Sequence, residues 1–133
     1  MRDLEEARAW FSGDRFATET TGIELAAAGP DYARCVLVPD GRHLNARGFV
    51  MGGAIFTLAD FTFAAASNSA ESGCVSMSSS ISYLNAVREG PLTAEARCLK
   101  SGRSTCTFEI TVTDGAGRVA AVVVTTGMRV SNK

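Results

Sequence analysis

One carboxylate stands out in this sequence because its neighbours are almost all apolar. Asp60 lies in an alanine- and phenylalanine-rich run over residues 54–66, and no lysine or arginine lies within a helical turn of it. A buried carboxylate without a partner is costly, so Asp60 requires hydrogen bonds, a distant partner or a neutral form. Either it occupies a small solvent-facing gap, or it is a general base or nucleophile with a raised pKa. We favour the second interpretation.

Two consecutive glycines, Gly52 and Gly53, precede this run. Glycines at a helix start let a ligand approach the backbone, and free N–H groups there can hold an oxyanion, although tight packing or a sharp turn would need the same residues. Gly52 and Asp60 are eight residues apart, which is about 12 Å along an α-helix. If both act on one reacting group, Asp60 must come from a second subunit with an antiparallel helix. The spacing therefore favours a two-fold dimer with sites between the subunits.

The loop before the glycines contains two more polar candidates. Asn45 precedes Gly52 by seven residues and could bind a water or a substrate carbonyl, although asparagine commonly forms turns. His43 is the only histidine in the chain and could titrate near neutrality. Its position in a loop predicts an exposed side chain that is not the catalyst.

Serines recur on a strand predicted at residues 74–84. They alternate with larger side chains, so one face of this strand is expected to carry the hydroxyl groups of Ser76, Ser78, Ser80 and Ser82. A half-exposed strand surface is the ordinary explanation for most of them. No Gly-x-Ser-x-Gly turn and no Ser/His/Asp set accompanies them, which disfavours a serine hydrolase.

Positive and negative charges are balanced, with 13 basic and 14 acidic residues. No basic stripe with interleaved aromatic residues is present, so a nucleic-acid partner is not expected. A basic turn at Lys100-Ser101-Gly102-Arg103 is either a solvated tip or a contact for phosphates. No apolar run reaches the roughly 20 residues of a membrane-spanning helix. The N-terminus also lacks the apolar stretch of a signal peptide, so a soluble cytoplasmic protein is expected.

The cysteines give weak support for a metal site. No two of them form a CxxC pair, and one histidine is available to help. Cys98 and Cys106 flank a predicted hairpin and could lie close together, but free thiols are expected in a reducing cytoplasm. We expect small core residues and no metal from the four cysteines, which are Cys35, Cys74, Cys98 and Cys106.

The periodicity of the sequence predicts the elements that position these residues. Residues 2–11 predict a short amphipathic helix, and residues 54–66 predict a long helix that is apolar on nearly every face. Such a helix must be wrapped by the rest of the chain. Strands are expected at residues 16–25, 32–38, 74–84, 92–99, 104–113 and 118–130, the last three joined by hairpin turns. The 133 residues therefore predict one α+β domain, an antiparallel curved sheet wrapped around one long central helix.

The last predicted strand differs from the others because residues 119–124 are apolar on both faces. Such a strand is either covered on both sides or meets a partner subunit. The strand therefore favours a homo-oligomer.

The run from Asn45 to Asp60 resembles the motif of hotdog-fold acyl-CoA thioesterases, in particular the PaaI-like group. In that family the pattern reads N-x-x-G-x-x-H-G-G-x-x-x-x-L-x-D. The chain matches it with identical spacing at Asn45, Gly48, Gly52, Gly53, Leu58 and Asp60. The resemblance implies the hotdog fold, subunits paired as dimers and further into tetramers, and no cofactor.

The resemblance also implies catalytic roles. Gly52 would donate its backbone N–H to the thioester carbonyl. Asp60 of the other subunit would attack that carbonyl or activate a water to do so. Asn45 would help to hold the water or the thioester, and the Ser76 hydroxyl would lie near the attacking water.

Substrate contacts are implied at four further positions. Lys100 and Arg103 would lie near the nucleotide end of coenzyme A, and Gly53 would contact the substrate. Met51 stands where the family usually has histidine, and a thioether cannot donate a hydrogen bond to an oxyanion. Losing one such donor costs about 3 kcal/mol, or about a hundredfold in rate. Met51 could instead line an adaptable acyl pocket.

Two classes of function remain open. The first is an acyl-CoA thioesterase, and the second is a non-catalytic acyl-CoA binding or sensing module, which Met51 supports. A hotdog hydratase or dehydratase ranks last because these enzymes generally need a histidine beside the acid, and His43 is poorly placed for that. The acyl group can be aromatic, short-chain or long-chain, and its carrier can be coenzyme A or acyl carrier protein.

Overall fold

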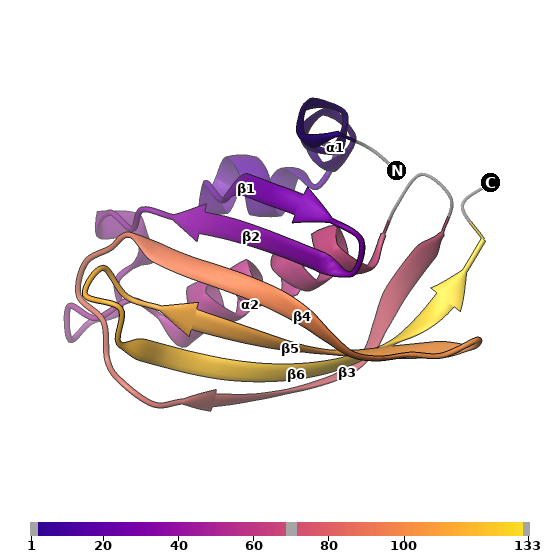
Figure 1. Ribbon diagram of the computed structural model, residues 1–133. Helices are drawn as coiled ribbons and strands as arrows, with labels where there is room; N and C mark the ends of the chain where they lie inside the picture. Colours follow the sequence, from indigo (N-terminus) through magenta and orange to yellow (C-terminus); the bar gives the residue numbers. More distant parts are fainter. Residues whose placement is uncertain (1–2, 69–71, 132–133) are drawn as a thin grey trace.

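A computed structural model describes residues 3–68 and 72–131 of the chain. A six-stranded antiparallel sheet curves around one long helix, α2, as Figure 1 shows. The elements are, in order, α1 (Leu4–Phe11), η1 (Phe16–Thr21), β1 (Glu24–Gly29), β2 (Tyr32–Leu37), η2 (Gly41–His43), α2 (Gly52–Ser67), β3 (Gly73–Tyr83), β4 (Leu92–Ser101), β5 (Thr105–Thr113) and β6 (Val119–Val130). The predicted α+β architecture is confirmed.

The order of strands in the sheet is β1-β2-β4-β5-β6-β3. The predicted hairpin turns join β4 to β5 and β5 to β6, so both hairpins are confirmed. β3 pairs with β6 and not with β4, the strand that follows it in the chain. As a result β3 lies at one edge of the sheet and β1 at the other, a pairing that the hairpin pattern alone does not predict.

The strand predicted at residues 16–25 is wrong for its first part. Phe16–Thr21 forms a π-helical turn, Gly22 ends it with a φ of 84°, and β1 begins at Glu24. Ala17 and Thr21 are the buried residues of the turn, four positions apart, as expected for a helical segment that packs one side. Threonines favour strands, but packing against α2 overrides that local preference here.

The other predicted elements lie within three residues of the observed ones. The first helix spans Leu4–Phe11, and its N-cap Asp3 accepts a hydrogen bond from the Glu6 N–H at 2.8 Å. Arg2, included in the predicted helix, lies outside the described residues. No helix within residues 3–68 and 72–131 is long and apolar enough to cross a membrane.

The core lies between α2 and the concave face of the sheet. Leu58, Ala59 and Thr62 are completely buried on the side of α2 that faces the strands. The rings of Phe63 on α2 and Phe108 on β5 meet edge to face, with centroids 5.6 Å apart. This large apolar contact fixes α2 against the sheet.

The opposite side of α2 is open along one stripe, although the sequence predicts a helix covered all round. The stripe consists of residues at helical spacing that are only partly covered, namely Gly53, Thr57, Asp60 and Ala64. The segment from Asp14 to Thr21 packs beside it. Asp60, the acid that the sequence singles out, reaches the surface along this stripe.

The cysteines are free thiols, as expected. The sulfur atom of Cys106 lies 2.7 Å from that of Cys74 on β3, a contact that the sequence did not predict. β6 lies between these two strands, and Gly127 of β6 leaves the space in which the two thiols meet. Sheet topology, which is not local in sequence, decides this pairing.

Candidate active site

The start of α2 presents two unused hydrogen-bond donors. Met51 is the N-cap, and its carbonyl oxygen accepts from the N–H groups of Ala54 and Ile55 at 3.0 and 3.3 Å. Across the part of the chain that the structure describes, the N–H groups of Gly52 and Gly53 have no hydrogen-bond partner. Adjacent N–H groups at the positive end of a helix dipole can bind a carbonyl oxygen that gains negative charge.

The two glycines differ in what surrounds them. The Tyr83 hydroxyl at the end of β3 donates a hydrogen bond to the Gly52 carbonyl oxygen at 2.9 Å. A Cβ on Gly52 would lie 2.9 Å from that hydroxyl, whereas a Cβ on Gly53 would meet no atom within 4 Å. Tight packing therefore explains Gly52, and Gly53 faces open space. Sequence reasoning missed Tyr83, because nothing local predicts that the end of a strand reaches a helix start.

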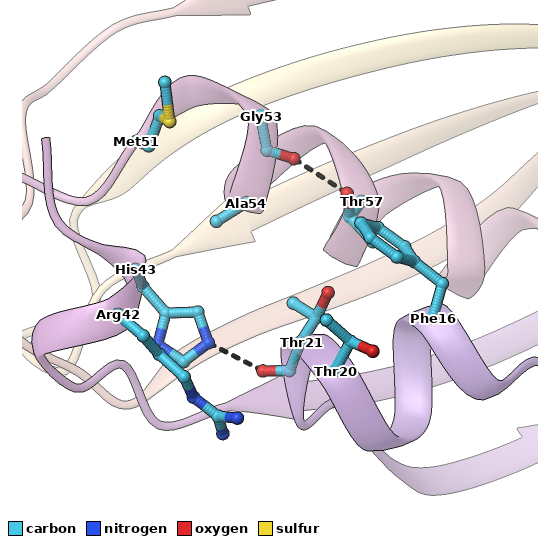
Figure 2. Close-up of a pocket in the computed structure, with 9 residues that line it drawn as sticks. All are labelled: Phe16, Thr20, Thr21, Arg42, His43, Met51, Gly53, Ala54 and Thr57. Carbon is cyan, nitrogen blue, oxygen red and sulfur yellow. Dashed lines mark hydrogen bonds between the residues drawn. The ribbon is translucent and has the colours of Figure 1, made fainter.

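A cavity of about 450 Å³ opens beside this helix start, and we call it the helix-start cavity. Figure 2 shows the residues around it, which come from η1, from η2 and from the first turns of α2. Its lining consists of Phe16, Thr20, Thr21, Arg42, His43, Met51, Gly53, Ala54 and Thr57. Both substrate-binding residues predicted at the helix start, Met51 and Gly53, thus lie on one cavity.

His43 is buried, with 6% of its surface exposed, so the prediction of an exposed loop residue is wrong. Its Nε2 lies 2.6 Å from the Thr21 carbonyl oxygen, and its Nδ1 accepts from the Asp40 N–H at 2.9 Å (Figure 2 shows the first of these). These contacts fit a neutral ring that donates through Nε2. His43 ties η2 to η1, and both ring nitrogens are engaged, which leaves none for a substrate.

Asp60 lines a second cavity of about 300 Å³, which we call the Asp60 cavity. Its carboxylate has no hydrogen bond or ion pair with residues 3–68 and 72–131. Burial, and next the negative charge of Asp14, raise the pKa of the Asp60 carboxyl above its ordinary value. The sequence offered a solvent-facing gap and a raised pKa as alternatives for Asp60. In the structure Asp60 has both. Asp14 was missed by sequence reasoning, because it lies in a polar segment far from Asp60 in the chain.

Asn45 organises the loop before α2. Its Oδ1 accepts from the N–H groups of Arg47 and Phe49 at 3.0 and 3.1 Å, and its own N–H donates to the Phe49 carbonyl at 2.7 Å. Gly48 completes the turn with a φ of 83°. Asn45 therefore forms a turn, which is one of the two roles considered for it from the sequence. The side-chain NH₂ of Asn45 has no partner within the described ranges.

Ser76 is separated from the other serines of β3 by a bulge. Ser76 lies opposite Gly127 and Ser78 lies opposite Thr126, so Met77 is the extra residue. Residues directly opposite each other point to the same face of a sheet, so Ser76 lies on the face of buried Gly127, which is the helix side. The remaining serines of the set lie on the outer face. The prediction of one face carrying all four hydroxyls is therefore wrong.

The basic turn lies at the same end of the sheet as Ser76. Ser101 pairs with Cys106, Cys106 with Gly127, and Gly127 with Ser76, so these residues form one row across four strands. Lys100 and Arg103 adjoin this row and are exposed. No group of three or more His, Cys, Asp and Glu side chains that could hold a metal occurs among the residues the structure describes.

Residues 47–121 match the thioesterase superfamily, a stretch that includes Gly52, Asp60 and Ser76. The chain belongs to the thioesterase superfamily. The family and the class of enzyme predicted from the sequence, a thioester hydrolase, are confirmed at this level.

Three known proteins illustrate the relationship. A protein of Archaeoglobus fulgidus, provisionally named an esterase, is 39% identical over 101 residues, which are 75% of this chain and 66% of that protein. The PaaI protein of E. coli, from the phenylacetic acid degradation operon, has a TM-score of 0.85 at 22% identity, over 97% of each chain. A protein of Streptococcus mutans bound to acetyl CoA has a TM-score of 0.78 at 27% identity, over 82% of this chain and 89% of that one. The predicted hotdog fold is confirmed.

In this thioesterase-superfamily member, the predicted site residues form two groups at opposite ends of the sheet. Tyr83 marks the end where Gly52 lies, and Ser76 marks the other, seven positions away along β3, which is about 23 Å. A Cβ on Gly127, opposite Ser76, would lie 2.7 Å from the Phe63 ring, so this part of α2, one turn beyond Asp60, is level with Ser76. One chain therefore keeps the two unused N–H groups apart from Asp60, Ser76 and the basic turn.

Proposed function

We propose that this chain is an acyl-CoA thioesterase in which Asp60 of one subunit acts on a thioester carbonyl held by the Gly52 N–H of its partner. The observation that carries the proposal is the pair of unused N–H groups at the start of α2, two helical turns from a carboxyl of raised pKa. The N–H groups can stabilise an oxyanion, and the Asp60 carboxyl can act as a base or nucleophile.

The separation of the two groups is the argument for a shared site. Two chains paired antiparallel along their β3 edges would place the Gly52 end of one beside the Asp60 end of the other. β3 is an edge strand whose residues 75–80 are exposed on both faces, with Val75 and Met77 among them. An exposed edge that carries apolar side chains is a surface suited to a partner. We therefore include a homodimer in the proposal.

The outer face of the sheet favours a second contact between subunits, separate from the β3 edge. Val124 and Met128 of β6 are exposed there, and Val122 is half-buried. These residues belong to the strand that the sequence singled out as apolar on both faces. Two dimers packed through this face would form the expected tetramer. The cytoplasmic location expected from the sequence also belongs to the proposal.

In the proposed reaction, the N–H groups of Gly52 and Gly53 hold the carbonyl oxygen while negative charge develops on it. Asp60 of the partner subunit either adds to the carbonyl carbon or takes a proton from a water that adds. The carbon–sulfur bond then breaks, and coenzyme A leaves as a thiolate that takes up a proton. If Asp60 itself adds, a water hydrolyses the resulting anhydride and frees the acid.

The other predicted residues support these steps. The Ser76 hydroxyl, on the Asp60 side of the site, would hold the attacking water, and the free NH₂ of Asn45 would donate to the water or the thioester. Lys100 and Arg103 would contact the phosphates of coenzyme A. Acetyl CoA bound to the Streptococcus mutans protein supports coenzyme A as the carrier.

A non-catalytic acyl-CoA binding or sensing module is the second candidate, and Met51 is the observation that favours it. Met51 is 58% exposed beside the two N–H groups and adds no donor to them. This candidate predicts binding of acyl-CoA without release of the thiol.

Release of free thiol from a panel of acyl-CoA esters tests the proposal. Asp60→Ala is expected to abolish release while it leaves the circular dichroism spectrum and oligomeric state unchanged, and Glu5→Ala, an exposed acid on α1, serves as the matched control. An Asp60→Ala protein as active as its parent would rule out the mechanism. Binding of acyl-CoA without thiol release from any ester would favour the second candidate.

Mixed subunits test whether the site is shared. Gly52→Pro removes the N–H at the first helical position, where the backbone tolerates proline although its Cβ displaces the Tyr83 ring, and Asp60→Ala removes the acid. If the site lies between subunits, mixing these two inactive variants restores part of the activity, because mixed dimers contain one intact site. No recovery after verified exchange of subunits would contradict the shared site.

A further inference from the structure

The helix-start cavity and the Asp60 cavity are neighbours along α2. Phe16 and Thr57 line both of them, one from η1 and the other from the open stripe of α2. Gly53 lies on the first cavity and Asp60 on the second. The two cavities therefore form one groove along the helix, and Phe16 and Thr57 lie where the cavities adjoin.

Phe16 is unusual among the aromatic residues because 66% of its surface is exposed. Figure 2 shows its ring directed toward Thr57, between the start of α2 and the next turns of that helix. Ala17, the next residue, is buried and anchors this part of η1 to the rest of the molecule. A large apolar side chain is thus held across the groove by a segment that is itself fixed.

The two sides of Phe16 differ in polarity. On the Gly53 side the lining surface is mostly apolar and includes Met51 and Ala54, although Arg42 also borders it. On the other side lie the carboxyl groups of Asp14 and Asp60. An apolar chain that extended beyond Phe16 would cover these carboxyl groups without replacing their contacts with water, which is unfavourable.

We infer that Phe16 is a specificity-determining residue that closes the far end of the acyl-binding cavity and restricts the substrate to compact acyl groups. This inference rests on the proposed function, because it takes the thioester carbonyl to lie at Gly52 and Gly53. From Gly53 to Thr57 the cavity extends one helical turn, or about 6 Å. Short-chain acyl groups or a single ring fit within that length, and long chains do not.

Graded acyl groups test the inference through hydrolysis and through binding. Hydrolysis uses saturated acyl-CoA esters from acetyl to dodecanoyl, with kcat/KM as the measure. Binding uses 2-oxoalkyl thioethers of coenzyme A of the same lengths, which keep a carbonyl but lack the hydrolysable bond. Phe16→Ala removes the ring that lies where the two cavities adjoin, and Phe16→Trp replaces it with a larger ring. Val38→Ala is the control, because Val38 is 69% exposed and borders neither cavity.

The parent protein is expected to prefer short groups. In Phe16→Ala the preference moves to longer chains, with a gain of about fourfold in affinity for each methylene newly buried. Phe16→Trp moves it to still shorter groups, and Val38→Ala leaves it unchanged. A parent protein that prefers long chains, or a Phe16→Ala profile equal to the parent's, overturns the inference.

The binding measurement separates this inference from the proposed function. Absence of thiol release from every ester, together with a Phe16-dependent preference among the thioethers, rejects hydrolysis and supports the role of Phe16. Absence of thiol release from every ester together with absence of binding to every thioether overturns both. Because Phe16 is mostly exposed, its substitution is expected to leave the melting temperature nearly unchanged.

Discussion

The hydroxyl group of Tyr83 donates a hydrogen bond to the carbonyl oxygen of Gly52 at 2.9 Å. This contact joins the end of β3, the open edge of the sheet, to the first residue of α2. A change at the edge strand therefore acts directly on the residue that carries the proposed oxyanion donor.

Substitution of the two glycines by alanine is expected to separate their roles. Gly53→Ala raises the free energy of unfolding by about 0.5–1 kcal/mol, because alanine favours the helix and its Cβ meets no atom within 4 Å. Gly52→Ala displaces the Tyr83 ring, offsets that gain and lowers kcat/KM for acyl-CoA. Urea unfolding and thiol release measure the two effects. Equal stability and equal activity of the two variants would show that the Tyr83 contact is unimportant.

Met51→His is expected to add the hydrogen-bond donor that the helix start lacks. If hydrolysis is limited by stabilisation of the oxyanion, kcat rises by about tenfold to a hundredfold. Met51→Leu, which keeps the apolar surface without a donor, is the matched control and should remain near the parent. A Met51→His protein that binds acyl-CoA but stays inactive would favour the binding module.

Asp60→Asn is expected to stabilise the protein at neutral pH while it abolishes hydrolysis. The pKa of Asp60 is raised in the folded state, so the folded protein holds this proton at a pH where the unfolded chain has released it. The free energy of unfolding therefore falls as the pH rises from the ordinary pKa of Asp60 in the unfolded chain to its raised pKa in the folded protein. Below the ordinary carboxyl pKa of about 4 both states are protonated, and the difference disappears. Urea unfolding at several pH values measures this, and a less stable Asp60→Asn at pH 7 would contradict it.

Asp14→Asn is expected to shift the acid limb of the pH–rate profile to lower pH. The charged groups that face Asp60 in its cavity are Asp14 and Arg15, and the negative charge of Asp14 helps to raise the pKa of Asp60. Without that charge, Asp60 loses its proton at lower pH and reaches its active carboxylate form sooner. Profiles of kcat/KM for Asp14→Asn and for the control Arg15→Gln would be compared. An unchanged acid limb in Asp14→Asn would exclude this coupling.

Gly127→Ala is expected to destabilise the fold by about 1–3 kcal/mol. The added Cβ would lie 2.6 Å from the Cys74 sulfur and 2.7 Å from the Phe63 ring, both in the core. Gly41→Ala is the control, because a Cβ there meets no atom within 4 Å. Thermal and urea unfolding measure the cost, and equal stability of the two variants would show that the core accommodates the methyl group.

Much of the architecture could be predicted because its signals are local. The run of apolar residues from Ala54 to Ala66 is too long for a strand, and the alternation from Cys106 to Val112 allows only one buried face. The turn at Phe16–Thr21 could not be predicted, because its threonines favour a strand and only packing against α2 favours a helix. The burial of His43 likewise depends on the Thr21 carbonyl, 22 residues away.

Apart from the turn at Phe16–Thr21, the sequence alone determined the order of the main helices and strands. It also determined the central helix and the placement of Gly52 and Asp60 two turns apart upon it, since helix geometry converts spacing into distance. It also predicted the family that the comparison confirmed. Only the tertiary structure decided that β3 lies at the sheet edge, that Tyr83 reaches Gly52, and that Asp14 and Phe16 border the stripe containing Asp60. These relationships join residues far apart in the chain, and they follow from burial and strand pairing, which no local pattern specifies.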